Sequence, residues 1–270
     1  MRNRIIMKGD FCLKSVILVL AMGIMPIAGF SQQKKTVVKR PKLPIEYVEK
    51  YNVGAQDDKN NTSRYMSCNI ASAKAKSDGT HVPKPEEWVG VFPLGGEVSF
   101  EDDDMLTDNV EYVMIKGETF EFTADYQRNM RTCYAIRLIS EDNLYRCAYR
   151  YKKIGSFRND NNLNSGVEVS VIYLGPSFKG SLKTIANENY WNANKSKIIR
   201  RYFPASGICY SNDTHIYGHP VCKLRGHVGY FWSDVISGVH VTTVTITGSG
   251  IGQTLVEGWN DVTLRSFTNE

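Results

Sequence analysis

Most of the chain has the hydrophobic pattern of β-strands. Between residues 97 and 175, and again after residue 200, short runs are rich in β-branched and aromatic residues and are bounded by Gly, Asn and Asp. Such runs are typical of strands separated by turns. Gly117 lies between two of them and predicts a β-hairpin. The predicted strands are 110–115, 118–126, 133–139, 144–154 and 167–174, followed by 201–207, 229–234, 239–247, 253–259 and 261–267.

Three short segments have the composition of helices instead. Residues 67–76 combine alanine and lysine, and residues 181–193 look helical as well. A third helix is expected to start near Pro83, because proline is favoured in a first turn and the acidic residues that follow suit the positive end of a helix. Its apolar face would carry Trp88, Val91 and Phe92.

The organised part of the chain begins with one more predicted strand. Over 45–53, apolar and charged residues alternate as in a half-buried strand. No internal repeat and no linker between two cores follows, so residues 45–270 are expected to form a single α+β domain. The polar, basic and proline-bearing stretch 32–44 would lead into it.

The first 31 residues are typical of a secretory signal peptide. Residues 16–30 are apolar and uncharged, and they follow a basic stretch that ends at Lys14. Small residues at Gly29 and Ser31 predict cleavage between Ser31 and Gln32. The apolar run is shorter than the ~20 residues that cross a bilayer, so no transmembrane segment is expected in the mature chain. The sequence thus predicts an extracytoplasmic protein: periplasmic, secreted or on the cell surface.

Charge gives no indication of a nucleic-acid partner. The chain carries 33 basic and 28 acidic residues, a net charge of +5. The predicted signal peptide holds four of the basic residues and one of the acidic residues, which leaves 29 against 27, a net charge of +2. A mature chain with a net charge so close to zero lacks the strongly basic composition that is typical of nucleic-acid-binding proteins.

Five cysteines remain after removal of the signal peptide, an odd number for an oxidising compartment. The two closely spaced pairs, Cys133 with Cys147 and Cys209 with Cys222, are the candidates for disulfides. Each would close a loop of about a dozen residues. Cys68 is left over, either as a small buried hydrophobic residue or as a partner in a different pairing.

A zinc site is the rival interpretation of the second pair. Cys209, His215, His219 and Cys222 are four zinc-type ligands within 14 residues, but the segment lacks the usual two cysteines separated by two residues. We favour the disulfide. The remaining histidines have no suitable partner nearby in the sequence, and no nucleophile motif or set of Ser, His and Asp stands out. We therefore predict no enzyme activity and no cofactor.

The order of several landmarks resembles a family of secreted and surface proteins. LPIEYVEKYNV (43–53) precedes NIASAKAKSDGTHVPKPEEWVGVFP (69–93), and YFPASGICY (202–210), GHVGYFWSD (226–234) and GWNDVTLRSF (258–267) follow late in the chain. This series resembles the major paralogous domain family first described from Fibrobacter succinogenes and abundant in Bacteroidetes. The resemblance covers residues 43–267, and its closing strand is longer here than the Ser-Val-Arg end of the family.

The resemblance implies a C-type-lectin-like fold with paired terminal strands, two helices and long loops. It also marks positions that match the family pattern, which we interpret as structural, because they are core aromatic residues or residues of tight turns. They are Pro83, Trp88, Phe203, Pro204, Gly207, Tyr230, Trp232, Gly258, Trp259 and Arg265.

The triplet Trp259-Asn260-Asp261 also has a chemical interpretation. Calcium-dependent lectins carry the same triplet, whose oxygens help to ligate calcium, and hard oxygen ligands suit that ion. The Glu-Pro-Asn or Gln-Pro-Asp partner motif of those lectins is absent from this chain. We therefore expect a fold that does not depend on metal, with Trp259 packed in the interior and the two polar residues serving a turn.

Two functional classes remain. The first is an exported, non-catalytic binding or adhesion module that contacts a glycan or a surface protein through loops on a rigid scaffold. The second is a structural or accessory subunit of a surface assembly such as a fimbria, which would bind sister subunits. The resemblance favours the first class without fixing a ligand.

Overall fold

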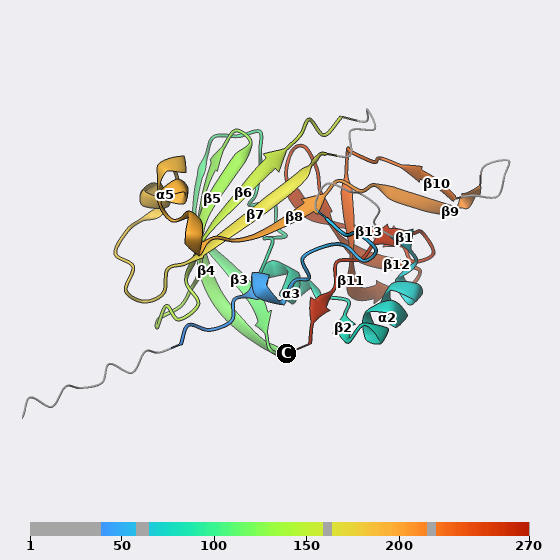
Figure 1. Cartoon of the computed structure of the whole chain (residues 1–270), viewed down its shortest axis with the longest axis horizontal. Helices are drawn as coiled ribbons and strands as arrows, with labels where there is room; N and C mark the ends of the chain where they lie inside the picture. The colour runs from blue at the N-terminus through green and yellow to red at the C-terminus, as the bar shows by residue number, and fades with distance from the viewer. Residues whose placement is uncertain (1–38, 58–64, 159–163, 215–219, 270) are drawn as a thin grey trace, which may run out of the picture. The chain divides into compact units, whose positions relative to one another are not determined.

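A computed structural model describes residues 39–57, 65–158, 164–214 and 220–269 of the chain (Figure 1). The predicted signal peptide, the first part of the lead-in that follows it, and both histidines of the zinc hypothesis, His215 and His219, lie outside these ranges. Within the described ranges, no helix is long and apolar enough to cross a membrane.

A six-stranded antiparallel sheet comes from the middle of the sequence, and its strands lie in chain order (Figure 1). The turn between its first two strands has Lys116 at φ 56° and Gly117 at φ 76°. Positive φ at both central residues is what a type I′ turn needs, so the predicted hairpin is confirmed. The strands are β3 (Met105–Ile115), β4 (Glu118–Asn129), β5 (Thr132–Ile139), β6 (Cys147–Ile154), β7 (Gly166–Tyr173) and β8 (Ile199–Pro204).

Short helices between β7 and β8 pack against part of one face of this sheet. They are α4 (Leu182–Ile185), α5 (Glu188–Ala193) and the 3-10 turn η1 (Lys195–Lys197). The single helix predicted over 181–193 is therefore interrupted. Asn187 has extended backbone angles, and its side-chain oxygen accepts a hydrogen bond from the Tyr190 amide at 3.0 Å. It thus caps a new helix instead of continuing the previous one.

A five-stranded sheet combines a segment near the N-terminus with the C-terminal third of the chain. Its order is β1-β14-β11-β12-β13, and β11 pairs in parallel with β14, whereas the other pairs are antiparallel. Gly248, Ser249 and Gly250 lie in the turn that links two of its strands. The strands are β1 (Tyr65–Met66), β11 (Gly229–Ser237), β12 (His240–Ile246), β13 (Ile251–Glu257) and β14 (Val262–Thr263).

Two further pairs of strands are short. β9 (Ile208–Thr214) pairs with β10 (Pro220–Lys223), and β2 (Thr80–His81) pairs with β15 (Phe267–Thr268). The strand predicted over 261–267 is thus divided between β14 and β15, which belong to different sheets.

The N-terminal part of the described chain is helical, in α1 (Pro44–Tyr47), α2 (Cys68–Ser77) and α3 (Pro85–Val89). The last two were predicted, but the strand expected over 45–53 is wrong. Pro44 occupies the first turn of α1, and the Glu46 carboxylate accepts a hydrogen bond from the Leu43 amide at 2.8 Å. This local capping favours a helical turn, while Ile45 and Tyr47 are still buried, as the alternation required.

One hydrophobic core is shared by the two larger sheets. It contains Val113 from β3, Phe231 from β11, Val244 from β12 and Trp88 from α3. A second cluster lies between α2 and the five-stranded sheet, and a third lies under α4 and α5. The chain therefore has a strand-rich α+β architecture, in agreement with the predicted class.

Candidate functional site

Most of the landmark residues meet in the interior. Trp88 is fully buried, and its indole nitrogen donates a hydrogen bond to the Trp232 carbonyl oxygen at 3.2 Å. The Trp232 indole in turn donates to the Met66 carbonyl oxygen at 2.8 Å. The Trp88 ring is surrounded by four phenylalanine rings with centroids 5.1–6.1 Å away, those of Phe92, Phe203, Phe231 and Phe267. These aromatic residues pack the core and leave no face for a ligand.

Arg265 is a buried structural residue. Its guanidinium lies 4.7 Å from the centre of the Phe203 ring and donates to the Asn52 side chain at 2.6 Å. It also donates to the carbonyl oxygens of Glu49, Lys50 and Tyr202. These oxygen acceptors satisfy donors of the buried guanidinium, so Arg265 joins the start of the described chain to its end.

Two of the landmark residues, Gly207 and Pro83, lie where two segments of backbone come close together. Gly207 has φ +79°, and a side chain there would collide with the backbone at Lys223 and Arg225. The Pro83 carbonyl accepts hydrogen bonds from Ser233 and Asp234. Tyr230 is only partly buried.

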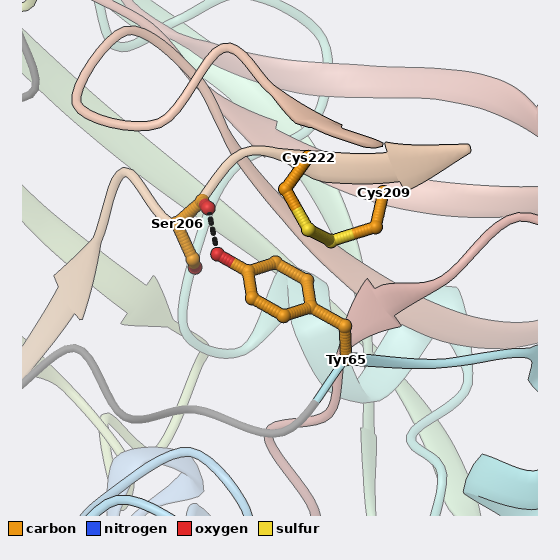
Figure 2. The surroundings of a disulfide bond; sticks show 4 residues. All are labelled: Tyr65, Ser206, Cys209 and Cys222. Carbon is orange, nitrogen blue, oxygen red and sulfur yellow. Dashed lines mark hydrogen bonds between the residues drawn. A yellow bond between two sulfur atoms is a disulfide. The ribbon is translucent and has the colours of Figure 1, made fainter. Parts of the chain in front are cut away.

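Cys209 and Cys222 form a disulfide between β9 and β10, where the two residues face each other in register. Figure 2 shows this bond with Tyr65, whose hydroxyl donates to the Ser206 carbonyl oxygen. The Cys209 backbone also exchanges two hydrogen bonds, of 2.9 and 2.8 Å, with the backbone of Asp261. Strand β9, which the disulfide joins to β10, therefore supports the turn that carries the Trp-Asn-Asp triplet.

The predicted Cys133–Cys147 disulfide is wrong, because both thiols are free and buried. In the β5–β6 pair, Cys133 faces Tyr151 and Cys147 faces Arg137. This register separates the two cysteines by four positions along the strands, about 14 Å at a strand rise of ~3.4 Å per residue. A disulfide needs Cα atoms within about 7 Å of each other. Cys68 is also free and is partly exposed.

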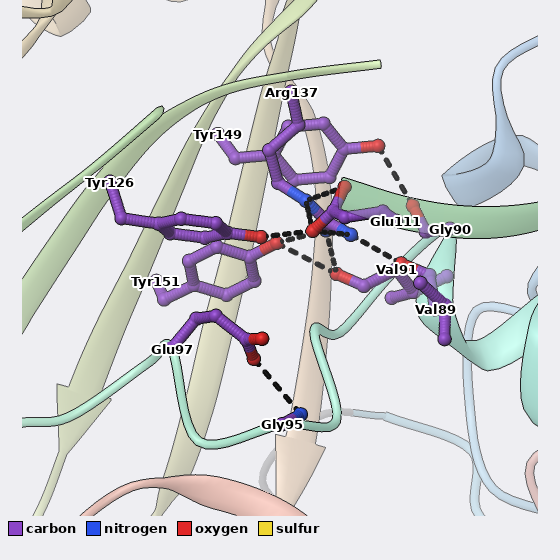
Figure 3. A network of polar contacts seen from close by, with 10 residues as sticks. All are labelled: Val89, Gly90, Val91, Gly95, Glu97, Glu111, Tyr126, Arg137, Tyr149 and Tyr151. Carbon is purple, nitrogen blue, oxygen red and sulfur yellow. Dashed lines mark hydrogen bonds and ion pairs between the residues drawn. The ribbon is translucent and has the colours of Figure 1, made fainter. Parts of the chain in front are cut away.

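A group of buried polar side chains surrounds Arg137 on β5 (Figure 3). Arg137 is fully buried and contacts both carboxylate oxygens of Glu111 at 3.0 and 3.1 Å. The same guanidinium donates to the carbonyl oxygens of Val89, the last residue of α3, and of Val91, just after it. Tyr126 donates to Glu111 as well. Sequence reasoning missed this group, since its members are dispersed over four segments.

The polar groups of this network bond to one another and to nearby backbone, which is the arrangement of a structural network and not of a catalytic site. The Tyr149 and Tyr151 hydroxyls donate to the carbonyl oxygens of Gly90 and Val91 at 2.8 and 2.9 Å. Burial raises the pKa of both tyrosines, so they stay protonated and keep donating. Each charged group has an internal partner, and the network fastens the segment after α3 to the six-stranded sheet.

An accessible pocket of about 530 Å³ lies at the end of the five-stranded sheet, beside Trp259. The prediction that Trp259 packs in the interior is wrong, because the side chain is 41% exposed. It is the one tryptophan of four that solvent reaches, since Trp88, Trp191 and Trp232 are buried. The described lining residues are Ser67, Cys68, Asn69, Ile236, Gly238, Val239, Val241, Gly258, Trp259 and Asp261.

Two turns shape this pocket. Gly238 has φ +61° in the two-residue turn between β11 and β12, where a type II′ hairpin needs glycine at its first central position. The turn leaves Ile236 and Val239 exposed. Gly258 allows the second turn to approach α2, because a side chain there would lie 3.2 Å from the Cys68 sulfur.

The turn that carries Trp259 is held by its backbone. The Gly258 amide donates to the Val239 carbonyl oxygen at 2.8 Å, and the Gly258 carbonyl accepts from the Cys68 amide at 3.2 Å. Together with the Cys209–Asp261 bridge, these bonds tie the turn to β9, α2 and the β11–β12 hairpin. The pocket is thus built before any ligand arrives.

Asp261 is the one charged residue among the described residues that line this pocket. Partial burial raises the pKa of its carboxyl group. Among the described residues, no hydrogen bond or ion pair reaches that carboxylate. Burial also raises the pKa of the Cys68 thiol, which is therefore protonated and neutral at pH 7. The pocket accordingly presents a negative charge beside an aromatic face.

The calcium hypothesis depends on Asn260 and Asp261, which face different surroundings. Asn260 is almost fully buried, and its amide nitrogen donates to the Glu257 carboxylate at 3.3 Å. Asp261 lines the pocket. In the described part of the chain, no three His, Cys, Asp or Glu side chains come together in a group that could hold a metal ion.

A second group that sequence reasoning missed is centred on His81. One ring nitrogen lies 2.8 Å from a Glu87 oxygen and the other 2.8 Å from the Asn269 side-chain oxygen. Asn269 is 188 residues away in the sequence, so no local signal indicated the contact. His81 joins the C-terminal strand to α3 and forms part of the wall of a pocket of about 320 Å³.

Comparisons with known proteins give the chain a family. A family model described as a domain of unknown function, DUF8237, matches residues 40–265. No curated protein matches the chain, and no solved structure matches it.

Proposed function

The chain belongs to the DUF8237 family, and from the site described above we propose that it is an exported, non-catalytic module that binds a glycan or a cell-surface protein around Trp259. The observation that carries this proposal is the half-exposed Trp259 beside a preformed pocket. A large aromatic side chain is costly to leave in water, and Trp is enriched where proteins bind partners.

Export is supported by two independent features. Residues 2–31 have the charged, apolar and small-residue order of a signal peptide. The disulfide between Cys209 and Cys222 suits an oxidising compartment. We therefore place the mature protein in the periplasm, at the cell surface or outside the cell.

We further propose a C-type-lectin-like scaffold into which the six-stranded sheet is inserted. This is supported by where the landmarks fall along the chain. Pro83 and Trp88 precede β3, and the remaining landmarks begin at Phe203, near the end of β8. The strands between them would then be the insertion, and the landmark residues would form the parent domain together with α2 and α3.

The alternative, a structural subunit of a surface assembly such as a fimbria, is favoured by a different surface. β3 is an outer strand of its sheet and, among the described residues, pairs on one side only. Val110 and Tyr112 on this strand are more than half exposed. An open edge with apolar side chains is suited to pairing with a strand of another subunit.

Two matched variants distinguish these functions. Trp259→Ala and Tyr112→Ala each remove an exposed aromatic side chain, one at the pocket and one at the β3 edge. We would measure binding of the mature protein, and of both variants, to a glycan array and to purified surface-assembly subunits. Loss in Trp259→Ala alone supports the binding module. Loss in Tyr112→Ala alone, with binding to subunits, would support the structural role instead.

A further inference from the structure

The pocket beside Trp259 has the electrostatic character of a site for a positive charge. Asp261 is its one charged described lining residue, and the neighbouring Cys68 thiol is neutral. Indole is the side-chain ring that attracts cations most strongly, and a carboxylate in the same pocket adds a formal opposite charge. No basic side chain occurs among the described lining residues, so none competes for Asp261.

The wall that the β11–β12 hairpin gives this pocket is apolar, whereas Ser67 and Asn69 line it at the start of α2. Ile236 and Val239 from the β11–β12 hairpin are 63% and 54% exposed, and Val241 lies deeper. An alkyl chain would cover these side chains, whereas a sugar ring would bring hydroxyl groups against them without hydrogen-bond partners. The hairpin wall therefore favours a cation that is carried on an apolar stem.

We propose that this pocket binds a basic side chain, lysine or arginine, presented by a partner protein. Its alkyl stem packs against Val239 and Trp259, and its cationic end pairs with Asp261. The inference rests on the proposed function, because it names the ligand of the same site. It also explains why a half-buried carboxylate lacks a partner in the free protein: the partner supplies the compensating charge.

The test uses the mature protein and small probes. Tryptophan fluorescence is titrated with Nα-acetyl-lysine amide and Nα-acetyl-arginine amide, and Trp259 reports the response because the other three indoles are buried. Nα-acetyl-norleucine amide is the uncharged control for the stem. Glucosamine and glucose test an amino sugar and a neutral sugar.

We expect a saturable fluorescence response to the two basic amides and little response to the norleucine amide. Because Trp259→Ala removes the reporter, its binding is measured by calorimetry, which should detect none. Asp261→Asn should weaken the affinity about three- to fivefold, the range for a partly exposed charge pair. Asp234→Asn is the matched control, since Asp234 is an exposed carboxylate on β11, and it should leave the affinity unchanged.

Several results would overturn the inference. Equal affinity for the norleucine amide, or no response to either basic amide, would show that the pocket does not recognise a positive charge. Binding of glucosamine or glucose alone, lost in calorimetry of Trp259→Ala, would assign the pocket to a glycan and leave the proposed function in place. Calorimetric binding that persists in Trp259→Ala would remove the proposed site as well.

Discussion

The ion pair between Arg137 and Glu111 should make one of the largest single contributions to stability. Arg137 is fully buried and Glu111 is 5% exposed. Glu111→Gln keeps the shape of the side chain but leaves the guanidinium without its counter-charge. Removing one member of a buried pair costs about 3–5 kcal/mol. With a urea slope near 3 kcal/mol/M for a domain of this size, the unfolding midpoint should fall by more than about 1 M.

Urea unfolding followed by tryptophan fluorescence measures this loss, and a double-mutant cycle identifies its origin. Arg137→Met should cost a similar amount, whereas the double variant with Glu111→Leu should cost much less than the sum of the single changes, because neither charge is then stranded. Binding at Trp259 should be unchanged in the folded variants. A cost below about 1 kcal/mol for Glu111→Gln, or strictly additive single changes, would refute the view that this network is a structural clamp.

Three further predictions concern other parts of the chain. Replacing Cys209 and Cys222 by alanine should lower the free energy of unfolding by about 3 kcal/mol through loop entropy, as urea unfolding under non-reducing conditions would show; an unchanged midpoint would count against the disulfide. The hydrogen bond that His81 donates to the Glu87 carboxylate raises the pKa of His81, so the stabilisation by this pair should be complete below about pH 6.5 and be lost as the pH rises through the folded-state pKa. Thermal melts of His81→Gln should lack that dependence, and a wild-type-like profile would contradict the pairing. Intact-mass measurement of exported protein should give a mature N-terminus at Gln32, and a retained initiator methionine would exclude cleavage.

The sequence predicted correctly those elements whose structure depends on residues close by along the chain. The hairpin at Gly117 was predicted because a two-residue turn with positive φ imposes a recognisable sequence. Helix α2 was predicted from its composition. The strand expected over 45–53 is wrong because the cap formed by Glu46 favours a helical turn, which buries the same alternating residues. Alternation of buried residues over three or four positions fits a single helical turn as well as a strand.

The candidate site depended on contacts that sequence spacing does not encode. Cys133 and Cys147 are close along the chain, but the register of their hairpin keeps them apart. Trp259 was expected in the core because the family resemblance aligns it with a core aromatic residue at the turn before the last strand, yet backbone bonds to Val239 and Cys68 hold its turn at the surface. Such tertiary hydrogen bonds decide which face of a turn meets water, and they join segments more than 15 residues apart.

Fluorine NMR of protein labelled with 5-fluorotryptophan tests the central claim most directly. The four tryptophans give four resonances, and Trp259→Phe identifies the one from the pocket. The labelled protein is mixed with the glycan and protein fractions of the envelope of the cells that produce it. We predict that one fraction shifts or broadens the Trp259 resonance selectively, while those of the buried tryptophans stay in place. Binding of a fraction that leaves the Trp259 resonance unchanged would contradict the claim that ligand is bound at this pocket.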